Sequence, residues 1–192
     1  NLIGDLGAWA LHKACEQAAK WPGKMKVAVN VSPIQFANDL LPKIVESALS
    51  SSGLPPQLLE LEITEGVFLQ ETADTDSMFK ALKKIGVRLA LDDFGTGYSS
   101  LGHLHRYPFN TLKLDRSFVL GLGDGSDRIG TGIVQAVLDL ASTMNLSVIA
   151  EGLETNRQRR HLRGMGCEFG QGYFYSKPVN AESAELLLVN TR

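Results

Sequence analysis

Two adjacent carboxylates end an apolar run near the middle of this chain. Asp92 and Asp93 follow Leu89–Leu91 and precede a Gly-Thr-Gly turn at 95–97. Adjacent carboxylates repel each other and lose hydration when they are buried, so a fold seldom places them at a strand end without a cation. The pair therefore predicts a cation site, in a loop of the kind where α/β proteins keep their chemistry.

Other polar side chains end other apolar runs. They are Asn30, Glu62, Lys113, Asp115, Glu151 and Gln171. If the runs are parallel strands, these groups meet at one mouth, where oxygen ligands without His or Cys suit Mg²⁺ or Mn²⁺ rather than Zn²⁺. Two such ions about 3.5–4 Å apart are the usual arrangement for hydrolysing phosphodiesters. A lysine at the rim can hold the attacking water or a phosphate oxygen.

Each of these residues also has a simpler interpretation. Asn30 is of a type that forms turns and caps, and Asp93 could be the N-cap of a following helix. Lys113 and Asp115 could form a buried structural ion pair. The concentration of such groups on one face and at one end of the predicted sheet favours the metal site, because chance would scatter them.

Six short apolar runs alternate with helical patterns along the chain. The predicted strands are Met25–Ser32, Leu58–Thr64, Val87–Phe94, Thr111–Ser117, Ser147–Glu151 and Phe169–Tyr175. The predicted helices, with apolar residues three and four apart, are Ala8–Lys20, Leu40–Ser52, Thr72–Lys84, Ile129–Met144 and Thr155–Met165. This alternation is typical of a parallel sheet, either a barrel or an open doubly wound sheet.

The phase of the strands distinguishes the two architectures. In the run 27–32, Val27, Val29 and Val31 share one face and Asn30 lies on the other. A sheet covered on both sides would be apolar on both faces, whereas one constant polar face fits a barrel. We therefore predict an α/β, TIM-like (β/α)8 barrel. Eight units take about 250 residues, so we expect this chain to hold about six βα units, truncated at the N-terminus.

Composition limits the classes of protein. The chain has 192 residues, 44% of them hydrophobic, and a formal net charge of -2, which suits one globular domain and gives no footprint for a nucleic-acid duplex. No apolar run reaches the ~18 residues of a membrane helix, and we expect no signal peptide. Cys15 and Cys167 are far apart, which indicates a reduced compartment. We expect a cytoplasmic protein, although a parent protein could be tethered to a membrane through further domains.

Six segments resemble the EAL-type cyclic-di-GMP phosphodiesterases of bacteria. They are NVSPIQF (Asn30–Phe36), ELEITE (Glu60–Glu65), DDFGTGYSSL (Asp92–Leu101), KLDRSFV (Lys113–Val119), AEGLE (Ala150–Glu154) and QGYFYSKP (Gln171–Pro178). The order and spacing agree across nearly the whole chain, so residues 1–192 are expected to form one partial domain of this type. The resemblance implies a (β/α)8-like barrel that hydrolyses cyclic di-GMP to linear pGpG.

The resemblance also implies roles for individual residues. The implied metal ligands are Asn30, Glu62, Asp92, Asp93 and Glu151. The implied catalytic residues are Lys113, on the attacking water; Glu151, as base or partner of the second metal; and Asp93. The implied supporting or substrate-contacting residues are Glu65, Asp115, Glu154 and Gln171. Glu65 would anchor the loop that begins Phe94, Gly95, Thr96, Gly97 and that couples dimer contacts to metal binding.

The chain departs from this family in one respect. The Glu-Ala-Leu motif that names the family is absent, and the chain starts in the family's first helix, around residues 3–15. The first metal therefore lacks a carboxylate and the barrel lacks part of its wall. We expect this piece to bind metal poorly and to be inactive alone, although its parent could be a working enzyme. Open sheet edges would invite pairing with another copy.

Partners and an alternative function follow from the same resemblance. It implies cyclic di-GMP as the ligand, two Mg²⁺ or Mn²⁺ ions in the intact domain, a homodimer, and sensory or GGDEF domains upstream in the parent. The alternative is a catalytically inactive c-di-GMP receptor or regulatory module of the same fold, in which metal ligands or loop residues are usually replaced. The five discriminating residues are all present, which favours the enzyme: Glu62, Asp92, Asp93, Lys113 and Glu151.

Overall fold

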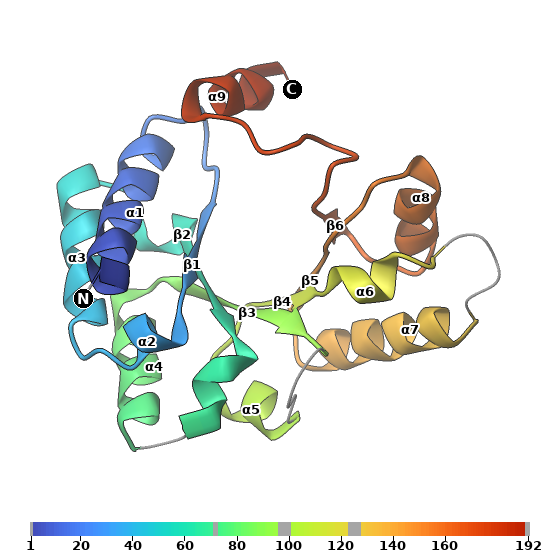
Figure 1. Cartoon of the computed structure of the whole chain (residues 1–192), viewed down its shortest axis with the longest axis horizontal. Helices are drawn as coiled ribbons and strands as arrows, with labels where there is room; N and C mark the ends of the chain where they lie inside the picture. Colours follow the sequence, from blue (N-terminus) through green and yellow to red (C-terminus); the bar gives the residue numbers. More distant parts are fainter. Residues whose placement is uncertain (1, 71–72, 96–100, 123–127, 191–192) are drawn as a thin grey trace.

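The computed structural model is a curved parallel sheet with helices on its outer side (Figure 1). It describes residues 2–70, 73–95, 101–122 and 128–190. Within these ranges the strands are β1 (Val27–Val31), β2 (Leu59–Thr64), β3 (Arg88–Phe94), β4 (Thr111–Leu114), β5 (Ser147–Ala150) and β6 (Phe169–Gly170). They pair in chain order and all in parallel. This is the order of a barrel wall, because a doubly wound sheet reverses its order at a switch point.

Helices connect the strands and cover the convex side of the sheet. The longer helices are α1 (Leu2–Ala18), α3 (Leu41–Ser52), α4 (Ala73–Ile85), α7 (Arg128–Thr143), α8 (Asn156–Gly164) and α9 (Ala181–Asn190). The shorter helical segments are α2 (Pro33–Phe36), η1 (Pro56–Leu58), η2 (Glu65–Gln70), α5 (Leu101–Arg106) and α6 (Arg116–Val119). Capping boxes begin α2 at Ser32 and α8 at Thr155, so local sequence fixes these starts. None of the described helices is long and apolar enough to cross a membrane.

The bulky face of the strands forms the core beneath the helices. Leu59, Leu61 and Ile63 of β2 are completely shielded from solvent. In β1, the valines at 29 and 31 are buried, whereas Asn30 on the other face is exposed. Burial of apolar area contributes about 25 cal/mol per Å², so this face holds the sheet against the helices. The predicted alternation and the predicted fold class, a TIM-like barrel reduced to six strands, are both confirmed.

The concave face of the sheet carries polar side chains in two layers. The lower layer is the one nearer the amino ends of the strands. There, Arg88 Nε donates to Glu60 Oε2 at 3.0 Å, and Thr111 Oγ1 donates to the same oxygen at 2.7 Å. Alternate residues of a strand share a face, so Glu62 lies above Glu60 and Lys113 lies above Thr111. The upper layer therefore occupies the carboxyl ends of the strands, on top of a layer whose charges are already paired.

All six predicted strands are longer than the strands of the structure, and two of them extend three or more residues past the observed carboxyl end. The run Thr111–Ser117 leaves the sheet after Leu114, because Asp115 is the N-cap of α6 and accepts a hydrogen bond from the Ser117 N–H at 2.9 Å. The run Phe169–Tyr175 is extended only at Phe169–Gly170. After Gly170 the chain turns, and the Phe174 N–H donates to the Leu153 carbonyl at 2.8 Å. The sequence analysis also missed α2, α5, α6 and α9.

The lower polar layer makes a testable contribution to stability. Glu60→Leu removes the buried partner of Arg88, and an unpaired charge in the interior costs about 3–5 kcal/mol. We expect the free energy of unfolding, measured by urea denaturation, to fall by about 3 kcal/mol. Glu60→Leu with Arg88→Leu should lose less than the two single changes summed, because the pair is coupled. Additive losses would contradict a paired layer.

Candidate metal and active site

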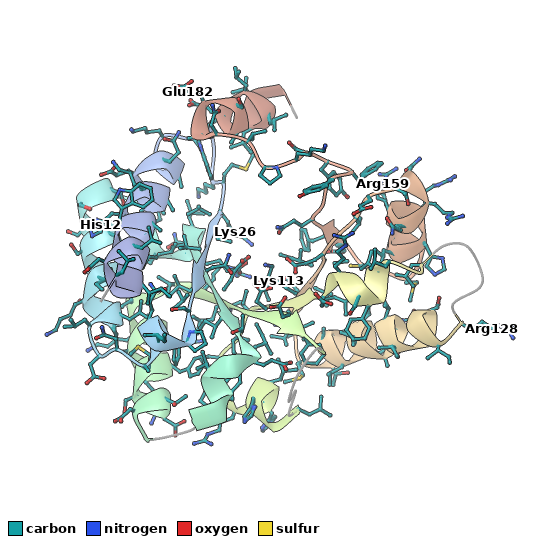
Figure 2. The ribbon with its side chains drawn as sticks, viewed as in Figure 1. His12, Lys26, Lys113, Arg128, Arg159 and Glu182 are labelled. Carbon is teal, nitrogen blue, oxygen red and sulfur yellow. The ribbon has the colours of Figure 1, made fainter. Side chains whose placement is uncertain are left out.

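Lys113 of β4 lies at the centre of a cluster of carboxylates. Its Nζ is 2.8 Å from Glu62 Oε2, 3.0 Å from Asp92 Oδ1 and 2.8 Å from Glu151 Oε1. The lysine side chain is 4% exposed, and the three acidic side chains are between 9% and 18% exposed. Figure 2 shows Lys113 near the middle of the view, inside the curve of the sheet. Charged side chains from β2, β3 and β4, and from the residue that follows β5, thus meet at one point.

The register of the sheet explains this convergence. Asn30 is the Cα partner of Glu62 across β1 and β2, and Thr64 is the partner of Asp92 across β2 and β3. Glu151 directly follows β5, and its N–H donates to the Leu114 carbonyl of β4 at 3.0 Å. Because the strands run in parallel, their carboxyl ends lie at one rim, where barrel enzymes carry their active sites.

Asp93 reaches the same rim through a local irregularity. It has a φ of 54°, and its N–H donates to Asp92 Oδ1 at 3.0 Å. The pairing of β3 with β4 shifts its register between Leu91 and Phe94. Simple alternation would turn Asp93 away from Asp92, but a bulge can re-aim a side chain. The interpretation of Asp93 as a helix N-cap is therefore wrong, since it belongs to β3.

Three carboxylates form a set that can hold a metal ion. Asp92, Asp93 and Glu151 each offer one oxygen, and these oxygens lie within 4.8 Å of one another. Oxygens bound to one Mg²⁺ at 2.0–2.1 Å are at most about 4.2 Å apart, so small side-chain adjustments suffice. The donors are all hard oxygens, which fits Mg²⁺ or Mn²⁺.

Burial and mutual repulsion shift the titration of this cluster. Burial raises the pKa of the Glu62 and Glu151 carboxyls above the ordinary 4.5, against the opposing effect of Lys113. Burial also raises the pKa of Asp93 above 3.8, and the charge of Asp92 adds to that rise. For Lys113, burial acts to lower the pKa, but hydrogen bonds with Glu151 and Glu62 outweigh it and the pKa is raised. The lysine stays protonated, and one ammonium cannot balance four carboxylates.

The loop after β3 is held at its first residue. The Gly95 N–H donates to Glu65 Oε1 at 3.3 Å, which is the contact expected if Glu65 anchors this loop. Phe94 is buried at the end of β3. Thr96 and Gly97 lie outside the described residues, so the prediction for them stays a prediction.

The remaining predicted residues lie around the rim. Asp115 caps α6, and Glu154 Oε1 is 2.9 Å from Arg116 Nη2. The alternative of a Lys113–Asp115 ion pair is wrong, because Lys113 pairs with the carboxylates of three other strands or their ends. Gln171 follows β6 with an exposed side chain, and its backbone N–H donates to the Ala150 carbonyl at 2.8 Å.

The chain belongs to the EAL domain family, whose model matches residues 1–178. It is 44% identical over 183 residues, 95% of this chain, to an uncharacterized signaling protein of Caulobacter vibrioides. It is 39% identical over 186 residues, again 95% of this chain, to MucR of Pseudomonas aeruginosa, named a bifunctional diguanylate cyclase/cyclic di-GMP phosphodiesterase. The chain spans only 22% and 27% of the lengths of these two relatives.

Solved structures agree with this assignment. The EAL domain of Mycobacterium smegmatis DcpA superposes with a TM-score of 0.91 at 39% identity, covering 99% of this chain and 86% of that one. The PaMucR phosphodiesterase in complex with c-di-GMP gives 0.88 at 38% identity, covering 95% and 75%. Klebsiella pneumoniae BlrP1 with manganese and cyclic di-GMP gives 0.83 at 28% identity, covering 91% and 45%. The predicted resemblance to this family is confirmed.

The raised carboxyl pKa values predict a pH-dependent metal affinity. Protons stay on Glu62 and Glu151 to a higher pH than on free carboxyls, and a metal ion must displace them. We expect the affinity for Mn²⁺ to rise as the pH rises above 4.5, and proton release on binding to be largest at the acidic end. Calorimetry at several pH values, in two buffers of different ionisation enthalpy, measures both quantities. A pH-independent affinity without proton release would contradict the assignment.

Proposed function

We propose that this chain is part of a metal-dependent EAL-type domain that hydrolyses cyclic di-GMP to linear pGpG. The observation that carries the proposal is the buried Lys113 ammonium among Glu62, Asp92 and Glu151, at the carboxyl ends of barrel strands. In a chain of this family, such a cluster combines metal-binding oxygens with a cation aimed at the same point. That combination suits an anionic diester substrate.

Five oxygen donors would hold the metal ions. They are Asn30, Glu62, Asp92, Asp93 and Glu151. Asp92 would hold a metal ion together with Asp93, and its contact with Lys113 would place that ion beside the ammonium group. When bound, a pair of Mg²⁺ or Mn²⁺ ions would supply an activated water at neutral pH and neutralise charge on the phosphoryl oxygens.

Side chains of the protein would orient the attacking water and the substrate, and would accept or donate protons. Lys113 keeps its charge at neutral pH, so it would attract the attacking water or a phosphoryl oxygen electrostatically, while its Nζ–H groups contact Glu62, Asp92 and Glu151. Glu151 accepts from Lys113 at 2.8 Å, and burial raises its carboxyl pKa above the ordinary value, which favours a role as a proton acceptor. Gln171 would hold a water at the rim, and Glu154 and Asp115 would support the loops.

Further partners belong to the same proposal. The relative MucR is named as bifunctional and is longer than this chain, which supports a parent protein with sensory or GGDEF domains. We also propose that the intact domain acts as a homodimer in the cytoplasm, with the loop after β3 between the dimer contacts and the metal site. The Glu65–Gly95 contact supports such a coupling at one point.

A charge-neutral substitution tests the enzyme assignment. In the full-length parent protein with Mn²⁺, Asp92→Asn should abolish turnover of cyclic di-GMP, a loss of at least about 10³-fold. It removes a ligand charge and keeps the side-chain shape, so circular dichroism should stay unchanged. Asp139→Asn, on the exposed side of α7, is the matched control and should keep full activity.

Chromatographic detection of pGpG gives the decisive readout. Unchanged turnover by Asp92→Asn would contradict the role of this carboxylate. If the unaltered protein binds cyclic di-GMP and yields no pGpG in Mn²⁺ or Mg²⁺, the receptor alternative replaces the enzyme.

A further inference from the structure

The short helix α6 lies between the two chain segments that carry the metal-binding carboxylates. It follows β4, and β4 is flanked in the sheet by β3 and β5. Asp92 and Asp93 end β3, and Glu151 directly follows β5. In Figure 1, α6 is drawn in yellow next to α7. A helix in this place can contact the segments after both flanking strands at once.

On the β3 side, Phe118 packs against the backbone of Gly95. A Cβ atom built on Gly95 would lie 2.7 Å from Phe118 Cζ and 2.8 Å from its Cε2, so the ring edge occupies the space that a side chain would need. The φ of Gly95 is 94°, a conformation that favours glycine. The Gly95 N–H is held by Glu65 at 3.3 Å. The residue two positions after Asp93 is thus placed between Phe118 and Glu65.

On the β5 side, Arg116 makes the corresponding contact with Gly152. A Cβ atom on Gly152 would lie 2.7 Å from Arg116 Cβ and even closer to its Cγ, and the φ of Gly152 is 69°. The guanidinium then reaches Glu154, at 2.9 Å. This ion pair is half exposed and contributes little by itself. The aliphatic stem against Gly152, next to Glu151, is the tighter contact.

We propose that Phe118 and Arg116 are positioning residues that fix the spacing between Asp93 and Glu151. This inference rests on the proposed function. Phe118 packs on Gly95, two residues after Asp93, and Arg116 packs on Gly152, next to Glu151. Neither side chain belongs to the metal set. Asp93 lies at the end of β3 and Glu151 lies just after β5, so their spacing depends on how the segments after these two strands are held. Groups that orient metal ligands typically change metal affinity or activity 10–100-fold when they are removed.

The first test concerns Phe118. In the full-length parent protein, Phe118→Ala should weaken Mn²⁺ binding, measured by calorimetry, about tenfold. It should lower kcat for cyclic di-GMP with little change in KM, and Phe118→Leu, which keeps a bulky apolar side chain, should lose less Mn²⁺ affinity and less kcat than Phe118→Ala. Leu138→Ala is the matched control, because Leu138 packs on the same core cluster from α7. It should change Mn²⁺ affinity less than twofold. Wild-type affinity in Phe118→Ala, or an equal loss in Leu138→Ala, would overturn the inference.

The second test compares a conservative change of Arg116 with its truncation. Arg116→Lys keeps most of the stem and the cation and should retain Mn²⁺ affinity within about twofold, whereas Arg116→Ala should lose about tenfold. Arg160→Ala, on the exposed face of α8, is the control and should match the wild type. Equal behaviour of Arg116→Lys and Arg116→Ala would overturn the role of this residue.

The two readouts keep this inference distinct from the proposed function. Mn²⁺ binding is measured without substrate. A wild-type protein that binds Mn²⁺ and releases no pGpG would overturn the phosphodiesterase alone. Unchanged Mn²⁺ affinity in Phe118→Ala and Arg116→Ala would overturn the positioning role alone.

Discussion

The structure depends on the placement of one ammonium group among four carboxylates. Lys113 contacts Glu62, Asp92 and Glu151 directly, and Asp93 lies in the same cluster. Burial removes hydration from these groups, and their like charges oppose ionisation. The lysine offsets part of this repulsion and leaves an excess of negative charge. The excess is the physical basis for a cation site. Burial is the main cause of the raised pKa values of Glu62, Asp93 and Glu151, and the neighbouring carboxylates add to the rise.

The parallel strands of the barrel wall form this cluster with few special requirements on the sequence. Each strand carries a polar side chain near its carboxyl end or is directly followed by one, and the parallel order brings these ends to one rim. Below them, Glu60, Arg88 and Thr111 already satisfy one another. The net charge of the upper layer therefore faces the mouth. Among the charged residues of this site, Asp93 alone has a positive φ, at a shift of register.

Alternation along single strands was enough to predict the barrel and most of the rim. Val29 and Val31 against Asn30 already indicate which face meets the helices, and the burial of β1 agrees. The ends of elements were less predictable, because one hydrogen bond decides them. The predicted strand through Ser117 ends early because Asp115 caps α6. The signal in the sequence for this helix start was Asp115 itself, a residue type that favours the N-cap position. The lower layer needed the cross-strand register, since Arg88 and Glu60 are 28 residues apart.

The metal-binding role of Asp92, Asp93 and Glu151 is the central claim, and it has a direct structural test. Crystals of the full-length parent protein grown with Mn²⁺ can be measured at the manganese absorption edge. The account predicts an anomalous peak at the rim, with oxygens of these three carboxylates about 2.1 Å away, and Lys113 still beside Glu62. Manganese bound elsewhere, with these carboxylates contacting only Lys113, would contradict it.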